Sequence, residues 1–196
     1  MKAGINSILL FFILFTSGIK VLAQEEEKGG FKKEKVFIGS ALNLGISGNA
    51  FQIGVNLEIG YSLTKWLDAG ITINFLYSSY RYTGFSDQLF NYGGGAVVRI
   101  WPINFLFISA IPEYNWINWT TKFINGAPSV SSKYNAGSLL LGGGYGRRIV
   151  GQAYSYFALM FDALQNPKSP YRDAENRALP IIRAGFAIYL SPSKKE

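Results

Sequence analysis

The clearest hydrophobic pattern in the chain runs from Phe51 to Tyr80. Between residues 51 and 61 every odd position carries a large apolar side chain, and the even positions from 52 to 62 are polar or glycine. After a short break at residues 62–65, the same alternation resumes from Leu67 to Tyr77. A period of two is typical of a β-strand with two different faces, so this stretch predicts a β-hairpin.

The composition of the polar face indicates what that face meets. On the first of the two strands its residues are Gly, Asn, Ser and Gln with the single carboxylate of Glu58, whereas a face in bulk water would carry more Lys, Glu and Thr. Both strands are also longer than ordinary soluble strands and match the roughly 9 to 11 residues that a tilted strand needs to cross a bilayer. We therefore expect the apolar face to meet lipid and the small polar face to line a lumen.

The rest of the chain extends this pattern to a complete barrel. Eight segments have strand character: 36–44, 51–62, 67–80, 90–101, 105–116, 136–148, 153–164 and 181–190. The connections after the second, fourth and sixth segments are short, at 63–66, 102–104 and 149–152. Those after the third, fifth and seventh are longer and polar, at 81–89, 117–135 and 165–180. Short periplasmic turns and long outer loops predict an all-β, eight-stranded, antiparallel, up-and-down transmembrane β-barrel with both termini in the periplasm.

The N-terminus has the features of an export signal. Lys2 precedes the apolar run Ile8–Phe15, and Val21 and Ala23 supply the small residues of a cleavage site. A membrane anchor helix is the weaker alternative, because the run is too short to span a bilayer. We therefore predict a signal peptide at 1–23, a periplasmic tail at 24–35, the barrel at 36–190 and a second periplasmic tail at 191–196. Loss of the signal peptide removes two lysines and lowers the formal net charge from +7 to +5.

Aromatic residues gather near the expected ends of the strands. Two belts of amphipathic rings are typical of the two membrane interfaces. The expected periplasmic belt comprises Tyr61, Trp66, Trp101 and Tyr189, and the expected outer belt comprises Tyr77, Tyr80, Tyr92, Tyr114, Trp116 and Trp119. The alternative is that aromatic residues are simply common in strands.

Two missing residue types narrow the possible chemistry. The chain contains no histidine and no cysteine, which removes the commonest general base, the commonest zinc ligand, thiolate metal sites and disulfides. Gly142-Gly143-Gly144-Tyr145-Gly146 lacks the lysine and helix of a phosphate-binding loop, and its glycines are better explained as letting neighbouring side chains fill a narrow lumen and letting the barrel wall bend. No catalytic residue, metal or cofactor is expected, and the positive charge is too diffuse to indicate nucleic-acid binding.

Four local motifs carry a resemblance to a known family. They are Gly93-Gly94-Gly95 leading to Arg99, the turn Trp101-Pro102-Ile103-Asn104, Pro112-Glu113-Tyr114, and the closing strand with Arg183, Gly185, Ile188 and Leu190. From residue 36 to residue 190 the chain resembles the small outer-membrane β-barrel family of Gram-negative bacteria, with the layout of the OmpA transmembrane domain, OmpX and OmpW. The closing strand is similar to the signal that the barrel-assembly machinery reads.

The resemblance implies a location in the cell outer membrane and a multi-pass, porin-like architecture. It also implies contact with outer-membrane lipids and lipopolysaccharide, with the barrel-assembly machinery during insertion, and with a possible envelope protein partner. The enzymes among such barrels use a histidine, which this chain lacks, so the resemblance implies a non-enzymatic protein. A fold of this kind hosts many functions, so the ligand stays open.

Charged residues at lumen positions are the main candidate site. They are Glu58, Arg99, Glu113, Asp162 and Arg183. In a narrow interior such charges must pair or stay hydrated. Since eight strands leave a lumen just wide enough for side chains to fill, we favour a plug of salt bridges over a gate or proton path.

Three functions are compatible with the sequence. The leading hypothesis is a structural or surface-interaction scaffold whose outer loops 117–135 and 165–180 make contacts, with Lys168, Arg172 and Arg177 as candidates for lipopolysaccharide phosphates or a protein. An equally good explanation is a solvated loop of mixed charge. The second hypothesis is an OmpW-like channel or transporter for small solutes, with Phe37, Val97, Ile111 and Leu140 lining an apolar pocket. The third, a periplasmic lipocalin-like binding barrel, would need an apolar interior and a charged exterior.

Overall fold

A computed structural model describes residues 30–172 and 175–190. The predicted signal peptide at 1–23, residues 24–29 of the predicted N-terminal tail and the predicted C-terminal tail at 191–196 lie outside the described residues. A short 3-10 helix at Lys33–Lys35 precedes the first strand. In the described part of the chain, no helix is both long and apolar enough to cross a membrane.

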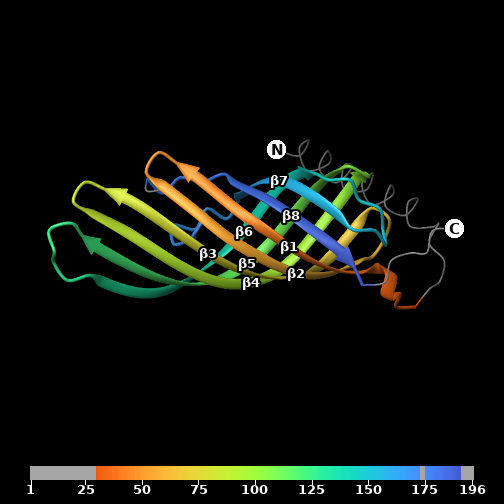
Figure 1. The fold of residues 1–196 in the computed structure, drawn as a ribbon, viewed down its shortest axis with the longest axis horizontal. Helices are drawn as coiled ribbons and strands as arrows, with labels where there is room; N and C mark the ends of the chain where they lie inside the picture. The colour runs from red at the N-terminus through yellow and green to blue at the C-terminus, as the bar shows by residue number, and fades with distance from the viewer. Residues whose placement is uncertain (1–29, 173–174, 191–196) are drawn as a thin grey trace, which may run out of the picture. The chain divides into compact units, whose positions relative to one another are not determined.

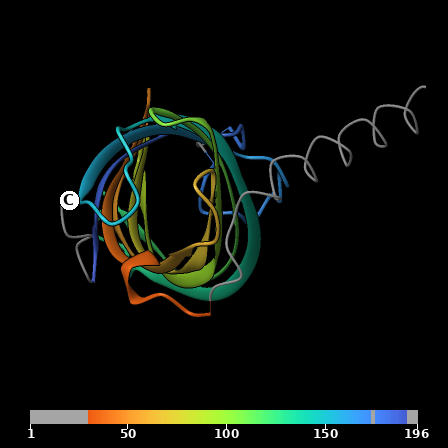
Figure 2. The ribbon, with the colours of Figure 1, turned by 90° about the vertical axis from the view of Figure 1, so that its right-hand side faces the viewer.

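Eight antiparallel strands form a single closed sheet in chain order, with the last strand paired to the first (Figures 1 and 2). Their bounds are β1 Val36–Ser47, β2 Ala50–Ser62, β3 Leu67–Tyr82, β4 Phe85–Ile103, β5 Leu106–Phe123, β6 Val130–Tyr145, β7 Tyr154–Asp162 and β8 Ile181–Tyr189. The eight-stranded, antiparallel, up-and-down barrel predicted from the sequence is confirmed.

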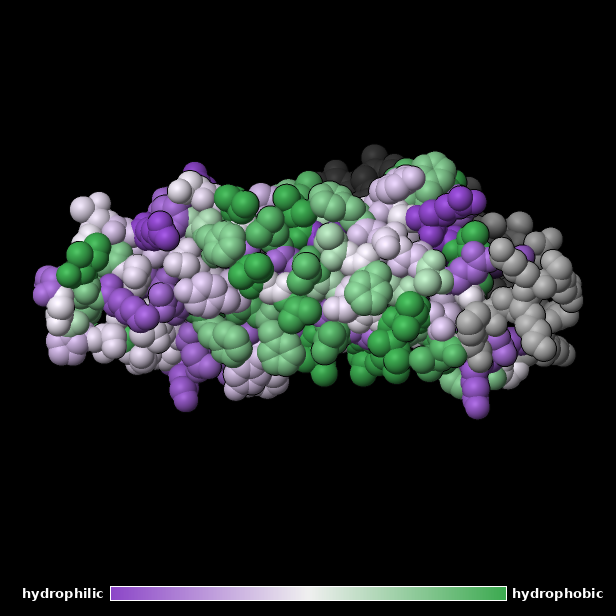
Figure 3. All heavy atoms as spheres, viewed as in Figure 1, coloured by the Kyte–Doolittle hydropathy of each residue, from purple (hydrophilic) through white to green (hydrophobic). Residues whose placement is uncertain are grey.

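The alternating sequence pattern separates the two faces of the wall. On β3, Ile71 and Ile73 are 61% and 52% exposed on the outer surface, whereas Thr72 between them is 3% exposed and points inward. The other strands behave in the same way, so apolar side chains form a band around the middle of the outer surface (Figure 3). The outer face of the barrel is therefore the apolar face, as the sequence predicts.

The two ends of the barrel differ, and we call them the base and the mouth. The base carries the connections at 63–66, 104–105 and 146–153, and the mouth carries those at 48–49, 83–84, 124–129 and 163–180. The segment 163–180, here called the mouth loop, is the longest of them, and residues 173–174 within it are not described. The sequence predicts short connections at the base and long ones at the mouth. This is wrong for the connection between β3 and β4, which lies at the mouth and has only two residues.

Strands β3 to β6 extend further at the mouth than the other four strands (Figure 1), beyond the apolar band seen in the same view in Figure 3. Pairing of β3 with β4 continues to Tyr82↔Phe85, and pairing of β5 with β6 continues to Thr121↔Val130. The predicted loops at 81–89 and 117–135 are therefore wrong, since most of those residues are strand. The sequence pattern misses these extensions because their outward residues, such as Arg81 and Lys122, lie above the apolar band and are polar.

One edge of this raised wall stays without a strand beside it. Among the described residues, β6 pairs with β7 only from Leu140↔Asp162 towards the base. Above that point the mouth loop lies against β6 through a few contacts, such as the hydrogen bond from the Ala163 amide to the Leu139 carbonyl at 2.8 Å. The backbone of β6 near Val130 therefore forms a sheet edge at the mouth.

The interior of the barrel is filled by side chains. Near the base and middle, buried aromatic and aliphatic residues from every strand except β2 pack in one cluster that also includes Tyr171 of the mouth loop. The glycines of β6 make room for it, since a Cβ at Gly144 would lie 2.5 Å from the Phe107 ring and one at Gly142 would lie 2.7 Å from the Met160 backbone. These glycines lie in the barrel wall, and their lack of a side chain lets large neighbours enter the lumen.

Candidate functional site

The five lumen charges predicted from the sequence all face the interior and are buried. Their exposed fractions are 6% for Glu58, 1% for Arg99, 5% for Glu113, 1% for Asp162 and 2% for Arg183. Each lies at an inward position of its strand, because the period of two assigns alternate residues to the lumen. The structure brings these residues together in two groups at different heights, and it places Asp162 at the mouth.

The lower group is an ion pair between Glu58 on β2 and Arg99 on β4, here called the lower pair. The two guanidinium nitrogens Nη1 and Nη2 of Arg99 donate to Oε1 and Oε2 of Glu58 at 2.7 Å and 2.6 Å. Nη2 also donates to the Tyr156 hydroxyl at 3.2 Å, and the guanidinium lies 4.7 Å from the centre of that ring. This bidentate geometry satisfies both carboxylate oxygens, which is the arrangement that a buried pair requires.

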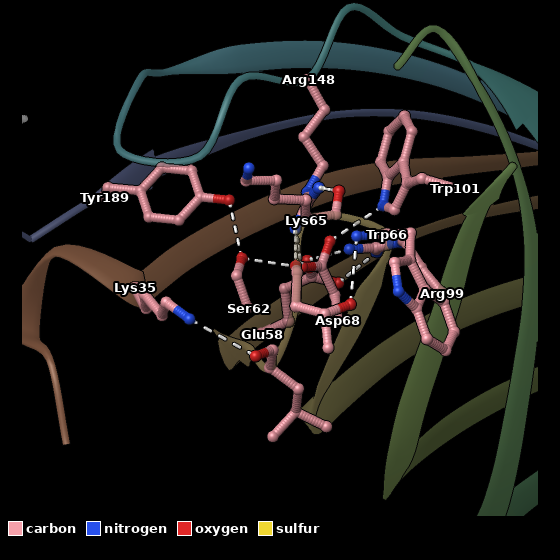
Figure 4. Close-up of polar contacts among 12 residues, drawn as sticks. Lys35, Glu58, Ser62, Lys65, Trp66, Asp68, Arg99, Trp101, Arg148 and Tyr189 are labelled. Carbon is pink, nitrogen blue, oxygen red and sulfur yellow. Dashed lines mark hydrogen bonds and ion pairs between the residues drawn. The ribbon is translucent and has the colours of Figure 1, made fainter. Parts of the chain in front are cut away.

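Below the lower pair, a second buried network closes the base, and we call it the base cluster: Ser62, Asp68, Trp101, Arg148 and Tyr189 (Figure 4). The carboxylate of Asp68 is its centre. It pairs with Nη2 of Arg148, and it accepts hydrogen bonds from the Trp101 indole at 2.9 Å and the Ser62 hydroxyl at 2.7 Å. Ser62 in turn shares a 2.8 Å hydrogen bond with the Tyr189 hydroxyl.

Arg148 ties the base connections to one another. It belongs to the connection 146–153, and its Nη1 donates to the Lys65 carbonyl at 2.6 Å across the base. Its guanidinium also lies 5.5 Å from the Trp101 ring. Sequence reasoning missed both Asp68 and Arg148. Asp68 could have been found, since it has the same parity as Thr72 on β3, but no sequence signal showed that Arg148 leaves its strand and turns into the base.

The upper group, here called the upper polar cluster, consists of Asn74, Asn91, Glu113, Asn115 and Tyr171. The Oε2 atom of Glu113 accepts hydrogen bonds from the Tyr171 hydroxyl at 2.6 Å and from the Asn74 amide at 2.9 Å. The amides of Asn74 and Asn91 also donate to Oδ1 of Asn115, at 2.8 Å and 3.2 Å. Burial and then the nearby Glu113 carboxylate raise the pKa of Tyr171 well above its usual value, so this hydroxyl stays protonated and donates.

Arg183 lies near this cluster and is held differently from Arg99. Its Nε donates to Oδ1 of Asn43 at 2.7 Å, and Asn43 also hydrogen bonds to Asn56. Several buried atoms of this region have no hydrogen-bond partner in the structure: Nη2 of Arg183, Oε1 of Glu113, Oδ1 of Asn91, Nδ2 of Asn115 and Nδ2 of Asn56. Both donors and acceptors are left over, and water is the molecule that satisfies both kinds.

The mouth loop folds into the barrel and covers this region. Tyr171 is fully buried, and the carbonyls of Pro170 and Arg172 accept hydrogen bonds from Gln52 and from Tyr80, the latter at 2.7 Å. On the opposite wall, the Ser138 and Ser169 hydroxyls lie 3.0 Å apart. Asp162 fixes the start of the loop, because its Oδ1 accepts from the backbone amides of Leu139 and Leu164 at 3.0 Å and 3.2 Å.

Three of the predicted belt residues are buried in the lumen, and a fourth, Trp119, occupies an inward position of β5 nearer the mouth. Trp101, Tyr189 and Tyr80 are 2%, 6% and 5% exposed, so they cannot lie at a membrane interface. Their parity explains the correction, since Trp101 shares a face with Arg99, and Tyr189 shares one with Arg183. Other belt residues are exposed outside, namely Tyr77, Tyr92, Tyr114 and Trp116, and the rest are half-buried, namely Tyr61, Trp66 and Trp119.

The predicted outer-loop contacts are also divided by the structure. Lys168 is exposed, and Arg177 is exposed with its Nη2 at 3.0 Å from Oε2 of Glu175. Arg172 is only 7% exposed and donates to the Asn176 carbonyl at 3.1 Å within the loop. Its guanidinium is thus part of the folded mouth loop, because the backbone around it is drawn into the barrel.

No metal site is apparent in residues 30–172 and 175–190, where no three acidic side chains gather in a suitable group.

The sequence matches no protein-family model and no curated protein. Similar solved structures do exist. They include Ail, the attachment invasion locus protein of Yersinia pestis, at 10% identity and a TM-score of 0.45, covering 78% of this chain and 93% of that one.

Two further structures have a similar degree of likeness. Neisserial surface protein A is 9% identical with a TM-score of 0.48, covering 79% of this chain and 96% of that one. The translocator domain of the autotransporter NalP from Neisseria meningitidis is 9% identical with a TM-score of 0.42, covering 93% of this chain and 97% of that one. Likeness at this level concerns the barrel fold alone.

Proposed function

We propose that this chain is a non-enzymatic, integral outer-membrane β-barrel with a closed lumen, serving as a structural or surface-interaction scaffold. The observation that carries this proposal is the distribution of side chains on the two faces of one closed sheet. Apolar residues surround the outside, and buried polar, charged and aromatic residues fill the inside. This is the reverse of a lipocalin-like barrel, and it suits a wall with lipid outside and a packed lumen inside.

The two ends of the barrel then take different positions. We place the base and both chain termini in the periplasm and the mouth outside the cell, since β1 begins and β8 ends at the base. The raised wall of β3 to β6 would stand above the membrane, where its polar outward residues and the free edge of β6 can meet other molecules. Lipopolysaccharide and outer-membrane lipids would surround the apolar band, and the barrel-assembly machinery would insert the chain.

The lumen supports a scaffold more strongly than a transporter of apolar solutes. The four candidate pocket residues Phe37, Val97, Ile111 and Leu140 are all at most 2% exposed and pack in one cluster with aromatic neighbours. They therefore behave as core residues. Together with the base cluster, the lower pair and the mouth loop, they fill the lumen at several successive heights.

A small-solute channel is the second candidate, and one observation favours it. The upper polar cluster contains buried donors and acceptors without protein partners, which suits a hydrated chamber. A pathway through the barrel would require that chamber to connect across the lower pair and the base cluster. Conductance in planar bilayers distinguishes the two functions: a closed scaffold is nearly silent, and steady conductance by the native protein would favour the channel.

Membrane insertion is tested separately from conductance. The mature chain, refolded into lipid vesicles, should migrate differently on a denaturing gel before and after boiling, because a closed barrel leaves no edge from which detergent can open it. It should also stay with the membrane fraction after carbonate extraction. Identical migration, or release by carbonate, would overturn the outer-membrane barrel.

Intact mass of the protein from cells tests the predicted cleavage between Ala23 and Gln24.

A further inference from the structure

Aromatic side chains cover the inner face of the raised wall at the mouth. They lie above the packed lumen, so packing of the lumen does not account for them. Tyr82, Trp119 and Tyr134 belong to this face, and the rings of Trp119 and Tyr134 lie 6.2 Å apart. They line one side of a cleft of 170 Å³ whose other side is the mouth loop with Arg172. The cleft continues past Trp119 and Tyr134 into a shallower hollow of 300 Å³ that Lys133 and Lys168 line.

We call the cleft and the adjoining hollow together the mouth cleft. Positively charged side chains lie on two of its sides. Lys133 borders the hollow from an outward position of β6, since Tyr134 beside it points inward, and Lys168 borders it from the mouth loop; both side chains are exposed to solvent. Arg172 is held in the loop wall by its hydrogen bond to the Asn176 carbonyl, so its position is fixed before any ligand arrives. Cations that flank aromatic rings in a concave site favour a ligand with an apolar face and an acidic substituent.

An acidic sugar has this combination of groups. The C–H groups on one face of a pyranose ring pack against aromatic rings, its hydroxyls hydrogen bond around the rim, and a carboxylate or sulfate interacts with lysine. The indole N–H of Trp119 already donates to the Thr121 hydroxyl at 3.1 Å, which holds the ring in place as a stacking surface. A rigid, preorganised ring loses little entropy on binding.

The direction of the cleft decides where the sugar comes from. The aromatic residues occupy inward positions of their strands, so the cleft opens towards the barrel axis, whereas the cell's own lipids surround the outward face. We propose that the mouth cleft binds the free end of an acidic oligosaccharide that reaches the protein from outside the cell. This inference rests on the proposed outer-membrane location, because only that location exposes the mouth.

The test uses the full mature protein in lipid vesicles. The probes are carboxylated oligosaccharides with their neutral counterparts: sialyllactose with lactose, and hyaluronan tetrasaccharide with chitotetraose. We expect at least one acidic probe to bind more tightly than its neutral counterpart, by calorimetry, and to lose affinity as salt is raised. Trp119→Ala should weaken that binding about tenfold, as loss of a stacking ring does in other polymer-binding sites. The double variant Lys133→Gln/Lys168→Gln should remove the preference for the acidic probe.

Two variants on β5, the strand that carries Trp119, control for general damage. Trp116→Ala and Lys122→Gln change outward residues of β5 that do not line the cleft, and both should bind like the native protein. Each variant must keep its heat-modifiable migration, so a failure of the barrel is seen separately from a failure of binding. Binding by neither acidic probe, equal binding of acidic and neutral probes, or an unchanged Trp119→Ala variant would overturn the proposal. The proposal would also be overturned if binding that depends on Trp119 were seen only with purified lipopolysaccharide, or only with an extended peptide that pairs with the β6 edge.

Discussion

Two buried carboxylates in one lumen are satisfied in different ways. Glu58 has both oxygens bound to the guanidinium of Arg99, and that guanidinium also contacts Tyr156. Glu113 has one oxygen bound to Asn74 and Tyr171, while its other oxygen has no hydrogen-bond partner in the structure. The first is a complete ion pair between two strands, and the second depends on a residue that the mouth loop supplies.

This difference assigns different roles to the two levels of the lumen. The lower pair joins β2 and β4, which are not neighbours in the sheet, and so it braces the barrel across its interior. The upper polar cluster joins the wall to the mouth loop, and its remaining donors and acceptors indicate water. We therefore expect the lower lumen to be rigid and the upper lumen to depend on how firmly the mouth loop is held.

The largest predicted effect comes from the lower pair. Glu58→Gln leaves Arg99 buried without its counter-charge, and breaking a buried pair in this way costs roughly 3 to 5 kcal/mol of unfolding free energy, less where water enters. Glu113→Gln should cost less, because that carboxylate is only partly satisfied. Urea unfolding in lipid vesicles, followed by the change in gel migration, measures both.

The exchange Glu58→Arg with Arg99→Glu tests whether the effect belongs to the pair. The double variant should recover part of the stability that each single variant loses, whereas the stability losses at two unrelated sites would simply add. Two results would mean that the two levels of the lumen do not differ as the structure indicates. One is an equal loss of unfolding free energy in Glu58→Gln and Glu113→Gln, and the other is a double variant whose loss equals the sum of the two single losses.

The second prediction concerns the hydrogen bond from the mouth loop to the upper polar cluster. Tyr171→Phe removes the hydroxyl that donates to Glu113 at 2.6 Å but keeps the buried ring. A hydrogen bond to a charged group contributes about 1.5 to 3 kcal/mol, so we expect a loss in that range by urea unfolding. Tyr145→Phe is the control, because its ring is 61% exposed on the outer surface. If Tyr171→Phe were as stable as this control, the loop would not depend on Glu113.

The alternating pattern was sufficient to predict the faces of the wall but not their contacts. It assigned Glu58, Arg99 and Arg183 to the lumen because parity within a strand is a local property. The same parity would have moved Trp101 and Tyr189 out of the predicted belt, had it been applied to aromatic residues as well. Which arginine pairs with Glu58 depends on register and barrel closure, and these are properties of the whole sheet.

The mouth was the least predictable part for a physical reason. Above the apolar band, both faces of β3 to β6 can be polar or aromatic, so the alternation weakens although the backbone pairing continues, as at Thr121↔Val130. The inward fold of the mouth loop depends on contacts between residues far apart in the chain, such as Tyr80 with Arg172. Hydrophobic periodicity contains no information on such contacts.

The smallest predicted effect tests how the mouth loop is held at the opposite wall. Ser138→Ala removes the hydroxyl that lies 3.0 Å from the Ser169 hydroxyl, and a neutral hydrogen bond of this kind contributes about 0.5 to 1.5 kcal/mol. Because this bond ties the loop to β6, its loss should raise the population of opened loop more than it lowers global stability. Trypsin should therefore cleave after Lys168 faster in this variant than in the native protein. Ser131→Ala removes a similar hydroxyl pair with Thr120 at 3.1 Å on the exposed part of the same strand, and it should leave the cleavage rate unchanged. Equal cleavage of both variants would mean that the loop is held by its buried tyrosine alone.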